Sequence, residues 1–210
     1  MDKKVLIRAL SFSTALAFFP VGILVLLLSR RARDGYLLSL KMIIKYESEA
    51  DAELFLKILE AAEDHRYRYH WGIDPIGILR AMRNILLGKR LEGASTIEQQ
   101  YVRTCTGNRE ISLVRKLEEV TVSVLLALSS EKNDIAYSYI CCAYFGEGLR
   151  GYMSVKAALW PEEFGTSANA YRAAAVIAML KRPKPTERSE KWEIALQNRA
   201  NYIIKRYSIA

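Results

Sequence analysis

Apolar residues along this chain gather in one long uncharged run and in several segments with a helical period. The run from Ala9 to Leu28 carries no charge, and about 20 apolar residues is the length that crosses a bilayer as a helix. Residues 112–130 and 190–207 repeat apolar side chains three and four positions apart, and residues 170–183 are alanine-rich up to a proline. No convincing set of alternating strands is present. The pattern therefore predicts a mainly α protein.

We interpret residues 1–34 as an N-terminal membrane anchor whose span covers about residues 9–28. A cleaved signal peptide is the alternative, but its apolar core would be shorter and a small-residue cleavage site would follow it. Here the charged sequence SRRARD follows the run directly. Pro20 is tolerable inside a membrane helix. Basic residues flank the run on both sides, so the positive-inside rule does not choose an orientation.

The remaining residues, 35–210, contain no internal repeat and no low-complexity linker, which indicates one domain. Residues 35–64 begin with apolar side chains and scattered lysines. This segment fits either a helix lying along a membrane surface or a helix facing the protein core.

The charge balance is basic, with 31 Lys and Arg against 23 Asp and Glu. It favours an anionic partner such as a phosphate, a nucleic acid or an anionic membrane face. The cysteines, Cys105, Cys141 and Cys142, have no CxxC spacing, and only two histidines are present. Neither a zinc site nor a disulfide framework is indicated, and we treat the cysteines as small apolar residues.

Three short segments carry candidate chemistry, and each also has an ordinary structural explanation. In EDHRYRYHWGID, residues 63–74, a Glu-Asp pair precedes a glycine turn, where a side chain can face a cleft, although such pairs are commonly solvated. In GASTIEQQYVR, residues 93–103, helix capping accounts for the Ser-Thr pair, and the Gln and Arg side chains behind it favour an anion site. In RKLEE, residues 115–119, two cations share a helix face with one carboxylate, as in an ordinary surface ion pair.

Taken together, the three segments resemble the ordered signature of the peptidoglycan glycosyltransferases of family 51, EDxxFxxHxGID, GxSTITQQ followed by Lys or Arg, and RKxxE. This family includes the monofunctional transglycosylases and the transglycosylase domains of penicillin-binding proteins. EKNDIAYSYICCAYFGEG and AAAVIAMLKRP agree more loosely with later family segments. The resemblance covers about residues 55–207. It implies a lysozyme-like glycosyltransferase fold with a head lobe and a smaller, membrane-contacting jaw lobe, behind one transmembrane helix.

The resemblance also implies the reaction. The family polymerises lipid II outside the cytoplasmic membrane and releases undecaprenyl pyrophosphate. Glu63 would be the general base that takes the proton from the 4-hydroxyl of the acceptor GlcNAc, whose oxygen attacks the anomeric carbon of the donor MurNAc with inversion. Glu119 would be the second catalytic carboxylate. The residues implied to bind substrate are Asp64, Ser95, Thr96, Gln99, Gln100, Arg103, Arg115 and Lys116.

These roles make chemical sense. Glycosyl transfer through an oxocarbenium-like transition state needs a carboxylate on the attacking side and charge neutralisation at the leaving group. Arg103 and Arg115 suit a diphosphate through their planar forks, and Lys116 suits it as a point charge. We interpret His70 and Asp74 as structural residues of the turn. Taking Glu63 as a surface residue, we expect Glu63→Gln to change thermal stability little.

Several positions depart from the family pattern. Tyr67 stands where the family usually has Phe, and Arg103 stands where Lys is commoner. Glu98 replaces a Thr, Thr104 and Cys141 each replace an Asn, and Ala173 replaces a Glu. Glu98 is expected to add a negative charge beside the proposed phosphate site. Two alternatives therefore stay open, a lysozyme-like enzyme that cleaves glycan and a non-catalytic, anchored paralogue that binds lipid-linked precursors.

The expected partners are lipid II, the nascent glycan strand, the membrane and cell-wall synthase or division proteins, but no nucleic acid. No cofactor is required, and a divalent cation stays an open alternative that nothing in the sequence indicates. The expected location is the bacterial inner membrane, in a single pass, with the catalytic domain outside the cytoplasm. We expect a monofunctional enzyme, because no transpeptidase segment follows.

Overall fold

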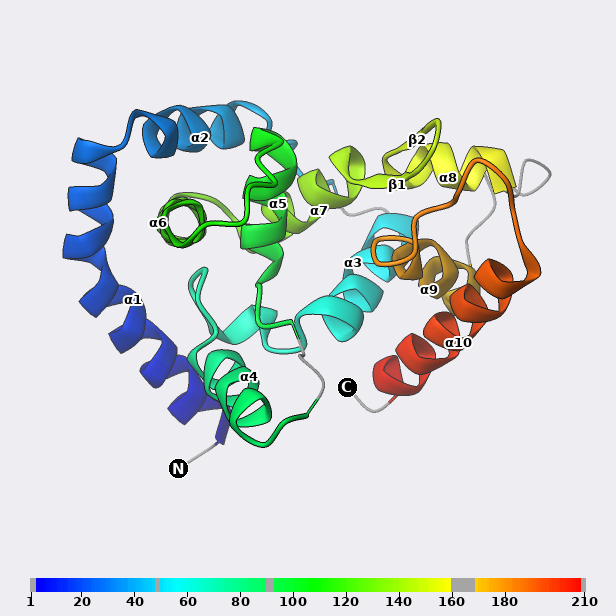
Figure 1. Cartoon of the computed structure of the whole chain (residues 1–210), viewed down its shortest axis with the longest axis horizontal. Helices are drawn as coiled ribbons and strands as arrows, with labels where there is room; N and C mark the ends of the chain where they lie inside the picture. Colours follow the sequence, from blue (N-terminus) through cyan, green and yellow to red (C-terminus); the bar gives the residue numbers. More distant parts are fainter. Residues whose placement is uncertain (1–2, 48–49, 90–92, 160–168, 209–210) are drawn as a thin grey trace. The chain divides into compact units, whose positions relative to one another are not determined.

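The computed structural model of the chain describes residues 3–47, 50–89, 93–159 and 169–208. Most of these residues are helical, which confirms the mainly α prediction (Figure 1). The α-helices of the described residues are α1 Lys3–Leu28, α2 Arg30–Lys41, α3 Ala50–Glu63, α4 Pro75–Leu86, α5 Ile97–Thr106, α6 Leu113–Ser129, α7 Lys132–Cys142, α8 Tyr152–Leu159, α9 Ala170–Ala178 and α10 Glu190–Tyr207.

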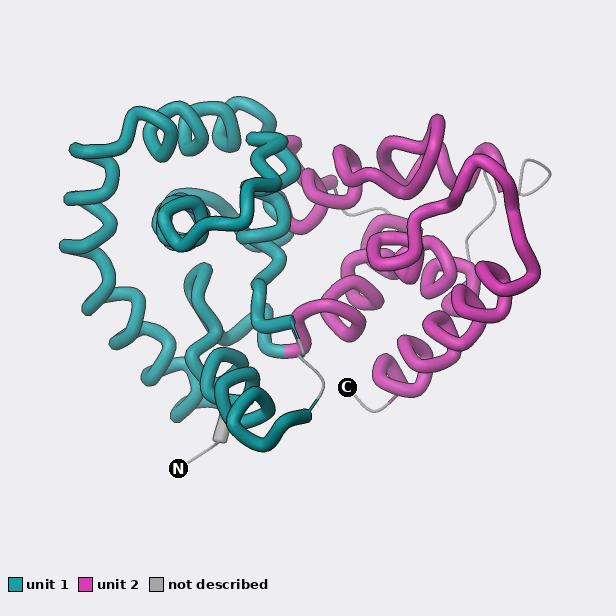
Figure 2. The backbone as a smooth tube through the Cα atoms, in the orientation of Figure 1, with its two compact units in different colours: residues 1–43, 66–135 teal, residues 44–65, 136–210 magenta. Residues whose placement is uncertain are grey.

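The chain divides into two compact units, each made of two separate segments (Figure 2). Unit 1 contains residues 1–43 and 66–135, and unit 2 contains residues 44–65 and 136–210. This division follows contacts between residues. It does not test the division into an anchor, residues 1–34, and a catalytic domain, residues 35–210, which stays a prediction.

Helix α6 lies at the centre of unit 1, and α1, α2 and α5 all pack against it (Figure 1). Ala15 of α1 is buried against Ile73 and Val124, and Phe18 and Trp71 pack around them. This apolar contact joins the N-terminal helix to the segment that carries the glycine turn. Unit 1 is therefore held together around the helix that carries RKLEE.

Helix α1 is the one helix among the described residues that is long and apolar enough to cross a membrane. It begins at Lys3, before the predicted span, and continues through Pro20 to Leu28. Ser11 and Ala15 are buried, whereas Leu16 is 62% exposed and most of the other apolar side chains of α1 are accessible. One side of the helix thus packs on unit 1, and the other presents an apolar face. Insertion of α1 in a membrane stays a prediction.

Unit 2 is built on three mutually packed helices, α3, α9 and α10. The small side chains of α9, Ala173, Ala174 and Ala178, are almost fully buried, so that its neighbours pack close to its backbone. Phe55 of α3 and Ile203 of α10 contribute larger side chains to the core. The alanine-rich and C-terminal helices predicted from the sequence are both present, and the first ends earlier than expected, at Ala178.

Two features differ from the sequence predictions. Residues 35–64 form no continuous helix, because helix α2 ends at Lys41 and α3 begins at Ala50. Helix α3 buries Phe55 and Leu59 in the core of unit 2, as the core-facing interpretation expects. In α2 the buried residues are small and Leu37 is 63% exposed, so the interpretation as a membrane-surface helix stays open for the start of the segment. A small antiparallel sheet also joins β1, Tyr144–Gly146, to β2, Leu149–Arg150. These strands are too short to produce a recognisable alternation in the sequence.

Candidate functional site

The first part of the candidate site is the start of helix α5, where the segment STIEQQ folds as an N-capped helix. The Thr96 hydroxyl accepts a hydrogen bond from the Gln99 backbone N–H at 3.3 Å and donates one to the Gly72 carbonyl at 3.1 Å. The Gln99 side-chain amide donates to the same carbonyl at 3.0 Å. The predicted cap is confirmed. Since the Thr96 side chain is 1% exposed and engaged in these bonds, its implied contact with substrate gains no support from the geometry.

Gly72 explains why the motif EDHRYRYHWGID contains a glycine at this position. Its φ angle is +74°, and a Cβ atom there would lie 2.5 Å from the backbone oxygen of Ser123 on α6. Only glycine combines this left-handed conformation with such a close approach. The turn is thereby held between α5 and α6, and the Gly72 carbonyl connects it to the STIEQQ segment through the Thr96 and Gln99 side chains.

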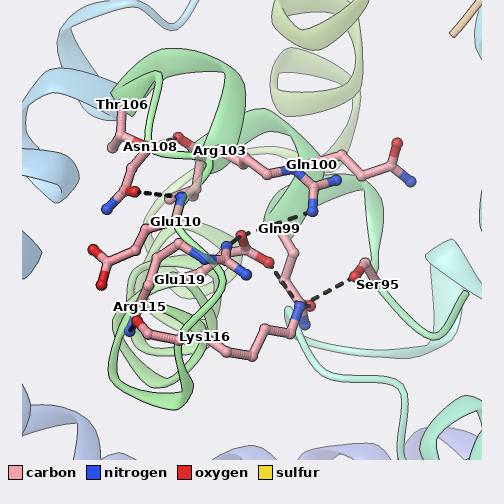
Figure 3. A network of polar contacts seen from close by, with 12 residues as sticks. Ser95, Gln99, Gln100, Arg103, Thr106, Asn108, Glu110, Arg115, Lys116 and Glu119 are labelled. Atoms are coloured by element: carbon pink, nitrogen blue, oxygen red, sulfur yellow. Dashed lines mark hydrogen bonds and ion pairs between the residues drawn. The ribbon is translucent and has the colours of Figure 1, made fainter.

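Helix α6 places the cations of RKLEE beside α5 (Figure 3). The Ser112 hydroxyl caps the helix by accepting from the Arg115 backbone N–H at 3.1 Å. One turn later, the Lys116 ammonium donates to Glu119 Oε1 at 2.7 Å, to Gln99 Oε1 at 2.6 Å and to Ser95 Oγ at 3.1 Å. The lysine therefore joins two motifs that the sequence analysis could only place in order along the chain.

Glu119 is the centre of a group that we name the cation cluster, formed by Arg103, Arg115, Lys116 and Glu119. Arg115 forms an ion pair with Glu119 Oε2, and Arg103 NH1 lies 4.0 Å from the same oxygen. The Glu119 side chain is 3% exposed. The ordinary interpretation of RKLEE as a surface ion pair is therefore wrong, because the carboxylate on which the cations converge is buried.

The cation cluster has the electrostatics of an anion site. Three cations surround one carboxylate, which leaves two positive charges uncompensated within the group. The Arg115 Nε is buried and has no hydrogen-bond partner among the described residues, so one guanidinium donor of the cluster is unsatisfied. Arg103 and Lys116 are each more than a third exposed and can therefore reach a ligand. A diphosphate supplies the acceptor oxygens and the charge that this arrangement lacks.

A cavity of about 340 Å³ adjoins the cation cluster in unit 1. It lies among α2, α5 and α6 and is lined by Arg103, Arg115 and Glu119 together with apolar side chains such as Leu38 and Val102. A cavity lined by both charged and apolar side chains suits a molecule that joins phosphate to hydrocarbon.

Two departures from the family pattern, Glu98 and Tyr67, meet at Lys132. Glu98 is fully buried, its carboxylate is paired with the Lys132 ammonium, and the distance from Glu98 Oε1 to His70 Nδ1 is 3.9 Å. The Tyr67 hydroxyl donates to the Lys132 carbonyl at 2.8 Å, and the Lys132 ammonium lies 4.2 Å from the centre of the Tyr67 ring. The negative charge expected from Glu98 beside the phosphate site is therefore balanced by Lys132 within unit 1.

Glu63 lies in unit 2, at the last position of helix α3. Its Oε2 is 3.0 Å from the Lys181 ammonium, and its Oε1 accepts a hydrogen bond from Arg199 NH2 at 3.0 Å. The Glu63 side chain is only 2% exposed. The interpretation of Glu63 as a surface carboxylate is therefore wrong. The expectation that Glu63→Gln leaves thermal stability nearly unchanged loses its basis.

Lys181 and Arg199 are the residues near the candidate site that the sequence analysis missed. Lys181 follows α9 and Arg199 belongs to α10, so both are distant from Glu63 in sequence. Neither lies in one of the three motifs. Lys181 falls in the segment AAAVIAMLKRP, which agrees loosely with the family, and Arg199 falls in the predicted C-terminal helix, but neither signal indicates a carboxylate partner.

The remaining predicted site residues are placed as follows. Asp64 is 6% exposed and lies beside Glu63 in unit 2. Ser95 and Gln99 contact the cation cluster, whereas the Gln100 side chain points away from it (Figure 3). The structure thus brings one group of candidates together in unit 1 and places Glu63 and Asp64 in unit 2. Their catalytic and binding roles stay predictions.

Asp74 has the structural role expected of it. Its carboxylate accepts hydrogen bonds from Arg66, including one from Nε at 3.0 Å, and it precedes helix α4. Burial opposes ionisation of Asp74, but hydrogen bonds from Arg66 and from the Gly77 backbone, together with the Arg66 charge, outweigh it and hold the pKa of this carboxyl below its ordinary value. The pair fixes the chain between the Glu-Asp motif and α4.

Two other departures lie in unit 2. Burial raises the pKa of the Cys141 thiol above its ordinary value, and a side-chain hydrogen bond with Tyr137 opposes this shift only in part. Ala173 is fully buried in α9, where a longer, charged side chain would need space and a partner. Cys105, Cys141 and Cys142 are free thiols.

Comparison with known proteins identifies the chain as a glycosyltransferase domain with the lysozyme-like fold. A family model described as Transglycosylase matches residues 43–208, and the chain belongs to this family.

Among curated relatives, the chain is similar to penicillin-binding protein 1A of Rickettsia prowazekii (strain Madrid E), with 35% identity over 152 residues, covering 70% of this chain and 19% of the relative. It is also similar to penicillin-binding protein 1A of Aquifex aeolicus (strain VF5), with 31% identity over 147 residues, covering 70% of this chain and 20% of the relative. Penicillin-binding protein 1B of Haemophilus influenzae (strain ATCC 51907 / DSM 11121 / KW20 / Rd) is 38% identical over 95 residues, covering 45% of this chain and 12% of the relative. The match thus spans about a fifth or less of the length of these relatives.

Proposed function

We propose that this chain is a membrane-anchored peptidoglycan glycosyltransferase that polymerises lipid II with inversion at the MurNAc anomeric carbon. The observation that carries the proposal is the cation cluster, in which Arg103, Arg115 and Lys116 converge on the buried Glu119. Such a group neutralises the charge that builds up on a departing diphosphate. Membership of the Transglycosylase family supports the same reaction class.

In this reaction Glu63 acts as the general base. It takes the proton from the acceptor hydroxyl as the oxygen forms a bond with the anomeric carbon of the donor, and the bond from that carbon to the diphosphate breaks. The leaving diphosphate keeps the electron pair and binds to Arg103, Arg115 and Lys116. Glu119 is the carboxylate that orients these cations, because two of them bond directly to it.

The membrane has a direct place in this proposal. The lipid of the donor stays in the bilayer, so an enzyme tethered by α1 meets its substrate in two dimensions. The cavity among α2, α5 and α6 supports the entry of a lipid-linked phosphate, since α2 directly follows α1 and Leu38 and Val102 line the cavity beside Arg103. We place the N-terminus in the cytoplasm and the catalytic domain outside it. Cell-wall synthases or division proteins are the protein partners that we expect.

The decisive experiment is incubation of the purified chain with lipid II in detergent, followed by separation of glycan products by size. A glycan polymer supports the proposal. Cleavage of preformed glycan without polymer formation would instead indicate a lysozyme-like hydrolase. Binding of lipid II without either product would indicate a non-catalytic paralogue, with the changed positions Cys141 and Ala173 as the first candidates for the loss.

A further inference from the structure

The candidate base Glu63 lies between two cations that belong to none of the three sequence motifs. Each carboxylate oxygen has its own partner, since Arg199 NH2 is 3.0 Å from Oε1 and the Lys181 ammonium is 3.0 Å from Oε2. The carboxylate side chain is 2% exposed, so its charge is shielded from water. A buried carboxylate needs such partners, because an unpaired buried charge is strongly destabilising.

The two cations differ in how firmly they are held. Arg199 is 21% exposed, and the same NH2 group also donates to the Ala62 carbonyl at 3.2 Å. Its helix, α10, packs directly on α3, the helix that ends at Glu63. Lys181 is 50% exposed. Arg199 is therefore the rigid partner, and Lys181 is the partner more accessible to solvent.

Holding a general base in one orientation has a direct kinetic value. A proton is transferred efficiently only when the accepting oxygen lies at hydrogen-bond distance from the substrate hydroxyl. A carboxylate bonded at both oxygens cannot rotate freely about its last side-chain torsion, whereas a carboxylate without these partners can. Each oxygen of an ionised carboxylate has two acceptor positions, so a hydroxyl can still bond to an oxygen that is already paired.

We infer that Arg199 and Lys181 are positioning residues that hold Glu63 ready for proton transfer. The inference rests on the proposed function, since it takes Glu63 as the base. It adds two residues of unit 2 to the reaction, both of which act through the Glu63 carboxylate. Arg199 contributes the larger share because its guanidinium is more buried and fixed by a second contact.

The kinetic test compares Arg199→Gln and Lys181→Gln with the matched control Arg182→Gln, which removes an exposed cation adjacent to Lys181. We expect Arg199→Gln to lower kcat on lipid II by about tenfold to a hundredfold, with KM changed by less than about twofold. Lys181→Gln should lower kcat less, Lys181→Arg should restore it, and Arg182→Gln should behave as the parent chain. Parental kcat in Arg199→Gln would overturn the inference while the proposed function stood.

A second measurement does not depend on activity. Arg199→Gln is made both in the parent and in Glu63→Gln, and thermal unfolding is followed by circular dichroism. In the parent it leaves a buried carboxylate short of one partner, so we expect Tm to fall by roughly 5 °C or more. In the Glu63→Gln background, Arg199→Gln should lower Tm by less than about half of the decrease seen in the parent. Equal losses in both backgrounds would overturn the pairing.

The two tests separate the two proposals. If the parent chain forms no polymer, the proposed function fails and the positioning role fails with it. Unequal Tm losses would then identify a purely structural ion pair. Both proposals are supported if the parent forms polymer, if the two Tm decreases are unequal, and if Arg199→Gln lowers kcat as described.

Discussion

The replacement of Glu63 by Gln tests the reaction most directly, because it removes the capacity to accept a proton while keeping the size of the side chain. Gln has nearly the size of Glu and keeps one acceptor oxygen, but its amide cannot take up the proton of the attacking hydroxyl. Loss of a general base typically lowers the rate by about a hundredfold to ten-thousandfold. This range corresponds to roughly 2.7 to 5.4 kcal/mol of transition-state stabilisation.

The structure changes the stability expected of this variant. The remaining oxygen of Gln can keep the bond with one cation, but its NH2 group faces the other cation as a second donor. Lys181 is half-exposed, so losing its pairing costs at most about 1 kcal/mol. Losing the charge-assisted bond from Arg199, which is 21% exposed, costs about 1.5 to 3 kcal/mol. We therefore expect a Tm decrease of roughly 2 to 12 °C, while the chain stays folded.

The assay follows glycan polymer formed from lipid II in detergent, with lipid II binding and thermal unfolding measured on the same preparation. Asp64→Asn is the matched control, because it changes the neighbouring carboxylate to its amide and should lower the rate less. Glu63→Gln should bind lipid II and unfold cooperatively, but produce almost no polymer. Polymerisation by Glu63→Gln at the parental rate would refute the assignment of the base. An equal loss of polymerisation rate in Asp64→Asn would refute the assignment of the general base to Glu63 in particular.

Four further outcomes are expected. Arg115→Ala and Lys116→Ala should each lower kcat on lipid II by roughly 10- to 100-fold, since a charge-assisted contact with phosphate is worth about 1.5 to 3 kcal/mol; unchanged turnover would show that the cation cluster is only structural. The lowered pKa of Asp74 stabilises the fold above its unfolded pKa of about 3.9, and this contribution is lost as pH falls through the lower folded value. Urea unfolding at pH 6 and below pH 4 should therefore show a smaller acid-dependent loss in Asp74→Asn than in the parent. A reporter enzyme that functions only outside the cytoplasm should be active when fused to the C-terminus, because the chain after about Arg33 is expected outside the cytoplasm. Activity of a reporter that functions only in the cytoplasm would contradict this topology. EDTA should leave polymerisation unchanged within about twofold, because protein cations neutralise the diphosphate, and loss restored by magnesium would disprove this expectation.

The helices could be predicted from the amino-acid sequence alone, because their signals are local. The period of apolar residues in 112–130 and 190–207 and the capping residues before them specify where a helix starts and which side is buried. Helices α6 and α10 accordingly begin within a residue of the predicted segments. The order of the three motifs was sufficient to indicate the family, which the match over residues 43–208 confirms. The short strands and the break between α2 and α3 were missed because a few residues carry too little periodic signal.

The pairing and the burial of charged side chains became visible only in the folded arrangement of the chain. Nothing in a linear sequence relates Glu63 to Arg199 or distinguishes an exposed RKLEE helix from one whose Glu119 is 3% exposed. Glu98 looked like an added charge at the phosphate site, and packing instead paired it with Lys132 in the core of unit 1. The physical reason is that local sequence encodes backbone preference and amphipathicity, whereas desolvation and ion pairing depend on segments brought together only by folding.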